Sequence, residues 1–302
     1  MKAVYSYSMN TCDSPVVLRD PDDLAYAELQ SLSSFSFQRG ASQPDELVQR
    51  AAGLGYAALA LTDECSVAGV VRAHEAALAC GLKLVLGAQF AVSLERCEEP
   101  VHQQAAVGHF TAVVLARNLA GWGQLCELIT AARRAAPKGQ YRMAWHAPLW
   151  QARWATLSDC EVLLQFPLAI NFEAAYTVSM GAKGLFGTRC WLAASLRLGL
   201  DDVLQRQRLE QLARCTGLEL VAVGDVHLHV RSRKPLHDIL TAVRLGQPVS
   251  ACGWALQPNA ELHLRSRERL ATLYPSAWRE RTLEIAARCH FDLRELRYHY
   301  PL

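Results

Sequence analysis

The sequence has no closely spaced cysteine pair and no long apolar run. Its 10 cysteines fall singly, without any Cys-x-x-Cys pair, a spacing that fits neither a zinc ribbon nor a small disulfide scaffold. No segment approaches the roughly 20 apolar residues that cross a bilayer, and the N-terminus lacks the apolar stretch of a signal peptide. These absences argue against secreted and membrane-spanning classes. They predict a cytoplasmic protein in which most cysteines are small core residues.

A large excess of charge is also missing. The 31 Lys and Arg residues against 29 Asp and Glu leave +2 over 302 residues, of which 51% are hydrophobic. This composition argues against disorder and against a polycation that holds nucleic acid by bulk charge. The net charge changes along the chain, from −6 in residues 1–100 (7 basic, 13 acidic) to +5 in residues 101–200 (9 basic, 4 acidic) and +3 in residues 201–302 (15 basic, 12 acidic). The basic part either faces an anionic partner or forms an ordinary mixed surface.

Apolar runs alternate with amphipathic segments over about two-thirds of the chain. Strands are predicted at 56–63, 83–92, 110–116, 161–166 and 218–227, and helices at 42–55, 66–81, 118–134, 201–217 and 236–244. Ser42 and Asn118 are predicted to cap the first and third of these helices. Such alternation indicates an α/β fold with a parallel sheet or a closed barrel, connected by right-handed crossovers.

Three segments depart from this alternation. Residues 1–23 are polar and indicate an irregular lead-in with at most one edge strand. The basic and aromatic stretch 137–154 is predicted to be a long surface loop, either stacking on nucleic acid or packing its tryptophans on the outside of the barrel. Residues 236–302 indicate a helical appendage, and its extended aromatic end suggests a chain cut before a further domain.

Polar residues lie at the predicted strand ends, where parallel α/β folds place their sites. They are Thr62, Asp63, Glu64, Gln89, Asp225 and His227, with His109 just before the strand at 110–116. Asp225 and His227 are two residues apart and point to one side of an extended segment. They either chelate a cation or form a hydrogen-bonded structural remnant.

Other chemistry has little support. Neither Gly-x-Gly-x-x-Gly nor Gly-x-x-x-x-Gly-Lys-Ser/Thr occurs, so no loop of the phosphate-cradling type is indicated. Cys65 follows a strand end and is either a nucleophile or, as we expect, a structural thiol.

The segment YAELQSLSSFSFQRGASQPDELVQRAAGLGYAALALTDECSVAGVVRAHEAALACGLKLVLGAQF resembles the opening of the PHP (polymerase and histidinol phosphatase) domain in bacterial C-family DNA polymerases. The blocks GHFTAVVLARNLAGWGQLCELIT, VAVGDVHLHVRSRKPLHDILTAVRLGQPV, ALQPNAELHLRS and LEIAARCHFDLRELRYHYP resemble later parts of the family in the same order. TDECSVAGVVRAH and GDVHLHVRSRKPL resemble its error-prone, damage-inducible branch. The resemblance covers residues 24–302 and is weakest at 137–190.

The resemblance implies an α/β fold of a particular kind, a PHP-type distorted (β/α)7 barrel at 24–235, followed by a short helical connector at 236–302. Active members hold up to three divalent metals at the strand ends. The resemblance places their opening His-x-His pair of ligands at Gln30 and Leu32 of this sequence, and the Asp that follows at Arg39. The His ligand after the Thr-Asp pair corresponds to Glu64, and a Glu ligand corresponds to Gln89. His109, Asp225 and His227 match the family.

These replacements predict a vacated metal site. Arg39 places a permanent positive charge where a dication would sit, and like charges about 4 Å apart repel by about 4 kcal/mol at an effective dielectric of about 20. We expect Arg39 to pair with Asp63, Glu64 or Asp225, and no catalytic residue, metal or cofactor in this chain. The alternative is a metal-dependent phosphoesterase or 3′-5′ exonuclease that uses the residual candidates Glu64, His109, Asp225 and His227.

The resemblance also implies a parent protein. That parent is an error-prone translesion DNA polymerase of DNA repair and replication, a nucleotidyltransferase whose palm carboxylates hold Mg²⁺. Fingers, palm and thumb would lie beyond Leu302, so the chain alone is not expected to polymerise DNA. The implied partners are the remainder of the polymerase chain and, through it, mutasome proteins, the sliding clamp and DNA. Arg231, Arg233 and Lys234 either contact a neighbouring domain or DNA phosphates, or form a solvated helix start.

Overall fold

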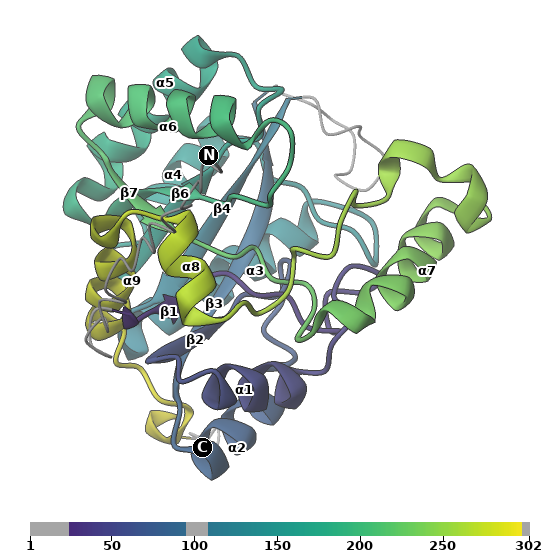
Figure 1. Ribbon diagram of the computed structural model, residues 1–302. Coiled ribbons are helices and arrows are strands. Elements are labelled where there is room, and N and C mark those ends of the chain that lie inside the picture. Colours follow the sequence, from purple (N-terminus) through teal and green to yellow (C-terminus); the bar gives the residue numbers. More distant parts are fainter. Residues whose placement is uncertain (1–23, 95–107, 298–302) are drawn as a thin grey trace, which may run out of the picture.

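A computed structural model describes residues 24–94 and 108–297; the predicted lead-in at 1–23 lies outside this range. One seven-stranded sheet forms its centre, and the strands lie side by side in chain order (Figure 1). The strands are β1 (Ala27–Glu28), β2 (Ala58–Leu61), β3 (Lys83–Ser93), β4 (His109–Ala116), β5 (Cys160–Gln165), β6 (Cys190–Ala194) and β7 (Glu219–Ala222). The predicted α/β class with barrel-like strands is confirmed.

One strand runs against the others. β4 is antiparallel to both β3 and β5, with Ser93 opposite His109 and Ala116 opposite Cys160. The expectation of a wholly parallel sheet is therefore wrong at β4. A parallel return needs a long crossover, usually a helix, and the sequence offers no helical pattern between 83–92 and 110–116. As a result, the first residue of β4 lies at the same edge as the carboxyl ends of the other strands.

The sheet curls until its two edge strands approach each other. Beyond β1 and β7, Ser31 and Val226 form a parallel bridge, and the Val226 amide donates to the Gln30 carbonyl at 2.9 Å. The buried Glu28 carboxylate adds a second connection, because its oxygens accept from the Gly224 amide at 2.9 and 3.0 Å. These bonds close the barrel at the edge where the strands end, which we call the barrel mouth.

The helices surround this barrel. They are α1 (Pro44–Gly53), α2 (Val70–Cys80), α3 (Leu119–Arg134), α4 (Pro148–Ala155), α5 (Phe172–Phe186), α6 (Asp202–Thr216), α7 (Lys234–Leu245), α8 (Arg267–Leu273) and α9 (Ser276–Arg288). Asn118 caps α3 as predicted, accepting from the Gly121 amide at 2.9 Å. The predicted cap at Ser42 is wrong, because α1 begins one residue later with Gln43 as its cap. The Ser42 hydroxyl instead lies 2.9 Å from His229 Nδ1.

The inside of the barrel is filled mostly by small and branched side chains, together with Trp191. Alternate residues of the strands form this inner core with Ile285, Ala286 and Cys289 from the end of α9. The Thr282 hydroxyl of α9 also accepts from the Ala27 amide of β1 at 3.0 Å. α9 belongs to the segment assigned as a connector, and it packs on both edge strands. The division at residue 235 stays a prediction.

The basic and aromatic stretch at 137–154 packs its tryptophans on the outside of the barrel, which was one of its two predicted roles, but it is not an exposed surface loop. Tyr141, Trp145, Trp150 and Trp154 are all buried, and its second half enters α4. Trp145 packs edge-on against Phe110 of β4, with ring centroids 5.8 Å apart. These aromatic rings are core material, so they are unavailable for stacking on bases.

α7 projects from the body of the molecule (Figure 1). Of its side chains only His237, Thr241 and Ala242 are buried. In the part of the chain that the structure describes, no helix is both long and apolar enough to span a membrane.

Candidate functional site

The barrel mouth is crossed by a network of amide hydrogen bonds centred on Gln30. Its Nε2 donates to Gln89 Oε1 at 3.1 Å, Gln165 Oε1 at 2.9 Å and Asp225 Oδ1 at 3.2 Å. The structure thus brings together three of the positions predicted to form the site and adds Gln165. An uncharged amide beyond β1 thus joins the middle of β3, the end of β5 and the segment that follows β7.

Asp225 is the most heavily bonded carboxylate of the mouth. It forms an ion pair with Arg197, accepts from Gln165 Nε2 at 3.2 Å and lies 3.4 Å from His227 Nε2. Burial alone would raise the pKa of Asp225, but the Arg197 guanidinium and His227 outweigh it and hold that pKa well below its usual range. Asp225 is therefore an ionised anchor. Its φ of 48° is a left-handed conformation that non-glycine residues rarely adopt.

His227 links this carboxylate to α7. Its Nδ1 lies 3.2 Å from Nε2 of His237, which is buried on α7. Burial, reinforced by the charge of His227, lowers the pKa of His237 to about 4. His237 is consequently neutral at pH 7, and the two rings share a hydrogen bond rather than repelling each other. The predicted proximity of Asp225 and His227 is confirmed, and their chain of contacts fixes α7 to the mouth.

Glu64 forms the second charged centre. Arg39 Nε lies 2.6 Å from Glu64 Oε2, and the buried Tyr141 hydroxyl donates to Glu64 Oε1 at 2.8 Å. The hypothesis that Arg39 pairs with a mouth carboxylate is confirmed, and Glu64 is the partner. Both carboxylate oxygens are occupied.

Asp63 bonds to the loop at residues 33–36 rather than to an arginine. It accepts from the Ser33 amide at 2.8 Å and from the hydroxyls of Ser33 and Ser36 at 2.7 and 2.6 Å. Burial raises the pKa of Asp63, although these bonds act in the opposite direction. Asp63 thus fixes the loop that carries Arg39. Leu32 in the same loop is buried, and its amide donates to the Val226 carbonyl at 2.7 Å.

Two further predicted positions lie at or behind the mouth. His109 opens β4 opposite Ser93, at the mouth edge. Cys65 is buried, and burial raises the pKa of its thiol to about 12. A thiol with such a pKa stays protonated at neutral pH, which supports a structural role over a nucleophilic one.

The three cations suggested as partner or DNA contacts are already paired. Arg231 lies 3.0 Å from Glu261, Lys234 lies 2.6 Å from Asp238, and Arg233 forms an ion pair with Glu46. These pairs neutralise much of the charge that the sequence pattern displays. Contact with a partner stays a prediction for these residues.

The residues of the mouth do not fit the divalent metals that the resemblance implies. Glu64 and Asp225 are each paired with a guanidinium, and Gln30 and Gln89 offer neutral amides that bond to each other. Within residues 24–94 and 108–297, no group of three or more His, Cys, Asp and Glu side chains is placed to hold a metal ion. Direct hydrogen bonds and ion pairs occupy the positions where ligands would be needed.

Four important residues escaped the sequence reasoning. Gln165 carried a usable signal, since it is a polar residue next to the end of the strand predicted at 161–166. Arg197 follows β6, a strand that the sequence pattern did not predict. Tyr141 lies in the stretch at 137–154, for which a surface loop was predicted. His237 showed no signal beyond its position in a predicted helix.

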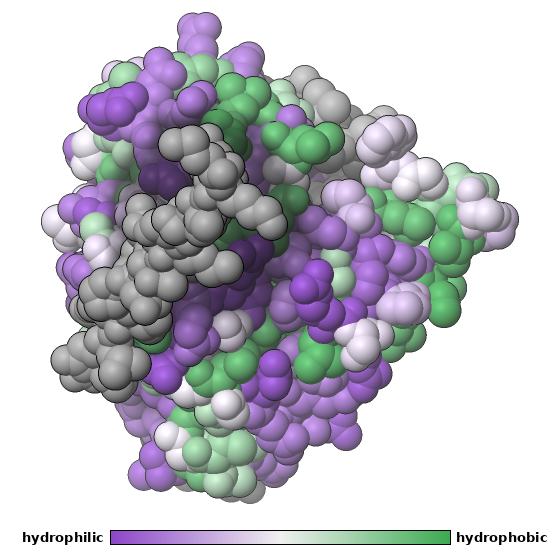
Figure 2. Space-filling view, in the orientation of Figure 1, coloured by the Kyte–Doolittle hydropathy of each residue, from purple (hydrophilic) through white to green (hydrophobic). Residues whose placement is uncertain are grey.

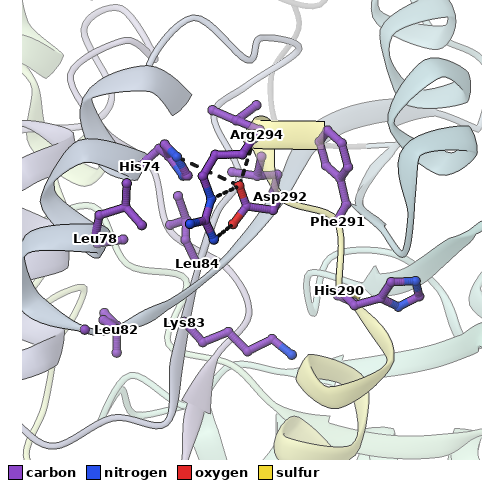
Figure 3. Close-up of a pocket in the computed structure, with 14 residues that line it drawn as sticks. His74, Leu78, Leu82, Lys83, Leu84, His290, Phe291, Asp292 and Arg294 are labelled. Atoms are coloured by element: carbon purple, nitrogen blue, oxygen red, sulfur yellow. Dashed lines mark hydrogen bonds and ion pairs between the residues drawn. The ribbon is translucent and has the colours of Figure 1, made fainter. Parts of the chain in front are cut away.

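A separate pocket of about 390 Å³ lies at the opposite edge, where β3 begins (Figure 3). Asp292 accepts from Arg294 Nε at 3.0 Å and Nη2 at 2.9 Å, and it lies 3.9 Å from His74 of α2. Asp292, the only carboxylate among the described residues that line this pocket, is thus already paired. These contacts join α2 to the segment that follows α9.

Comparison with known proteins finds a family for about half of the chain: residues 28–174 match the PHP domain family. The chain is similar to error-prone DNA polymerases: it is 47% identical to that of Methylococcus capsulatus over 281 residues, 92% of this chain and 24% of the polymerase. The polymerase of Dechloromonas aromatica is 46% identical over 277 residues, 91% of this chain and 25% of its own length.

The chain spans about a quarter of the length of these curated relatives. Among solved structures, a candidate metal-dependent phosphoesterase from Bifidobacterium adolescentis overlaps 67% of this chain and 88% of its own, with 15% identity and a TM-score of 0.48.

Proposed function

We propose that this chain is the PHP module of an error-prone translesion DNA polymerase and that its barrel mouth is structural rather than hydrolytic. One observation carries the proposal: Arg39 and Arg197 are paired with Glu64 and Asp225, the two acidic side chains among the residual metal-ligand candidates. Metal-dependent hydrolysis needs a bound ion to activate water and hold phosphate oxygens. Here the guanidiniums cross-link the strand ends by charge-assisted hydrogen bonds instead.

The proposal assigns polymerisation to the rest of the parent polymerase. Template-directed nucleotidyl transfer across damaged DNA would use Mg²⁺ on palm carboxylates outside the region that matches this chain. Mutasome proteins, the sliding clamp and DNA would be reached through that larger part, in the cytoplasm. The share of the relatives that the chain covers, 24% to 25%, supports this division of labour.

Metal analysis and a nuclease assay test the structural role. After treatment with a chelator and dialysis against Zn²⁺ or Mn²⁺, we expect far less than one ion per chain and no 3′ cleavage of a single-stranded oligonucleotide. The physical reason is that metal binding would have to displace both ion pairs from the carboxylates.

The exonuclease alternative makes the opposite prediction. A stoichiometry near one ion per chain that disappears in Asp225→Ala would contradict the structural role. Cleavage that is lost when His109 and Asp225 are both replaced would do the same, and an Arg206→Gln variant, changed on the outer surface of α6, serves as the control for purity and folding.

A surface on α7 supports a partner-binding role. Leu236, Ile239 and Val243 are exposed along one side of this helix, and Phe37 and Trp254 are exposed as well. Figure 2 shows apolar side chains gathered on this projecting part. A hollow of about 400 Å³ separates α7 from the loop that contains Phe37. Exposed apolar surface of this kind usually marks an interface. Because the relatives are about four times longer than this chain, we propose that the accompanying polymerase region covers it.

Association in trans tests this surface. The chain is mixed with the part of the Methylococcus capsulatus polymerase that it does not match, and Ile239→Ser with Val243→Ser is expected to weaken binding at least tenfold, since two apolar contacts are lost. Val203→Ser with Leu204→Ser on α6, also exposed, is the matched control. Absence of binding by the unsubstituted chain, or equal weakening by both pairs, would refute the assignment.

A further inference from the structure

The hollow beside α7 is a cleft with two different walls. Its volume is about 400 Å³, within the range of roughly 300–1,000 Å³ that is typical of binding pockets. One wall is α7, which contributes Leu236, Leu240 and Val243. These positions are four and three residues apart, so they lie on one side of the helix. The other wall is the turn at 34–40, which carries Phe37, a side chain that is 85% exposed. We call this hollow the Phe37 cleft.

The turn that carries Phe37 is held in a fixed, strained shape. Gln38 has a φ of 59°, a left-handed conformation that residues other than glycine rarely adopt. The Arg39 amide donates to the Ser36 carbonyl at 3.0 Å, and the Ser36 hydroxyl donates to Asp63 at 2.6 Å. Strain that surrounding bonds maintain is characteristic of functional segments. Because the turn is already ordered, a partner that contacts Phe37 has less conformational entropy to offset.

The α7 wall is fixed as well, and the charges of the cleft are already paired. His237 of α7 lies 3.2 Å from His227, which joins the helix to the barrel mouth. Glu46 and Arg233, the two charged side chains among the described residues that line the cleft, form an ion pair with each other. Glu46 also accepts from the Gln43 amide at 2.8 Å. An occupant that brought a charge would leave it without a partner, so the cleft favours an apolar one.

The walls also limit the backbone conformation of an occupant. In neither wall does the described chain form a β-strand, so an extended segment would find no strand edge with which to pair. A helix satisfies its own backbone groups. Its apolar side chains recur at the spacing of Leu236, Leu240 and Val243, which lets two helices pack side by side. The cleft therefore fits the apolar face of a helix better than it fits a strand.

We infer that the Phe37 cleft receives the apolar face of a helix from the accompanying polymerase region, with Phe37 as its anchoring contact. The inference rests on the proposed function, which assigns the α7 surface to that region. The cleft continues this surface, because Val243 belongs to both. The relatives are about four times longer than this chain, so they contain the additional chain from which such a helix would come. An aromatic side chain at the centre of an interface is a common source of binding energy.

Association in trans measures the contribution of Phe37. In a mixture of the chain with the part of the Methylococcus capsulatus polymerase that it does not match, Phe37→Ser is expected to raise the dissociation constant at least tenfold. Phe37→Leu should restore most of the affinity, because an apolar side chain remains. Neither substitution should change the thermal midpoint, since Phe37 is exposed. Leu149→Ser on α4, which is also exposed, is the matched control.

The outcome separates this inference from the proposed function. Ile239 lies on the α7 surface but does not line the cleft. Weaker binding by Ile239→Ser, with unchanged binding by Phe37→Ser, would refute this inference alone. Absence of binding by the unsubstituted chain would refute both this inference and the assignment of the α7 surface.

A photoreactive side chain at position 37 identifies the occupant. The amino acid p-benzoylphenylalanine replaces Phe37 in a full-length polymerase in which this chain substitutes for the matching region of the Methylococcus capsulatus enzyme. After irradiation, we expect a crosslink to a segment outside the matching region whose apolar residues recur every three or four positions. A segment with alternating apolar residues would refute the helix, and a crosslink to a second polymerase molecule would refute the occupant. The same probe at Leu149 should give neither crosslink.

Discussion

Replacing Arg197 by methionine is expected to lower the free energy of unfolding by about 2–3 kcal/mol at pH 7, measured by urea denaturation. Asp225 is buried and ionised, and Arg197 is its guanidinium partner. Without that partner the carboxylate keeps the desolvation cost of burial but loses the opposing charge. We place the effect below that of a fully buried pair because the Arg197 side chain is partly exposed to solvent.

A second substitution separates the charge from the packing of Arg197. Asp225→Asn in the Arg197→Met chain should restore most of the lost stability, since a neutral amide tolerates burial better than an unpaired carboxylate. Arg206→Met, which removes an exposed pair with Glu210, should cost less than about 1 kcal/mol. If the double variant were as unstable as Arg197→Met alone, loss of the ion pair would not be the cause.

The elements that sequence reasoning recovered have strong local signals. The helix at 118–134 has an Asn cap and regular apolar spacing, β2 is an unbroken apolar run, and β3 is mostly apolar. α5 and β6 were not predicted from the sequence. The orientation of β4 depends on which strands it contacts, which the composition of a strand does not encode.

The ion pair of Arg39 was the part of the site that the sequence predicted, because an arginine is incompatible with the divalent metal expected there. A cation at position 39, among residues that should hold a dication, limits the partners of Arg39 to nearby carboxylates, and Glu64 was one of three candidates. Arg197 could not be found in this way, because it follows the unrecognised strand β6. Tyr141 was missed because the surrounding basic residues resemble a solvated loop, whereas its ring is buried and its hydroxyl bonds to Glu64.

The pH dependence of stability should reveal two buried groups that act in opposite directions. Burial raises the pKa of Glu28, the carboxylate that closes the barrel, from 4.5 to about 7. Between these values the folded chain keeps a proton that the unfolded chain releases, so stability falls as pH rises. Burial lowers the pKa of His237 from 6.5 to about 4. There the unfolded chain takes up a proton that the folded chain excludes, so stability increases with pH.

The two contributions overlap between pH 5 and 6.5 and should largely cancel in the unsubstituted protein. Over this window each amounts to about 2 kcal/mol. Relative to the unsubstituted chain, Glu28→Gln should therefore gain stability with rising pH, and His237→Gln should lose it by a similar amount. Urea denaturation at several pH values measures both differences, from which groups common to all three chains cancel. Parallel curves would show that neither buried group changes its pKa on folding, and the double variant should follow the slope of the unsubstituted protein.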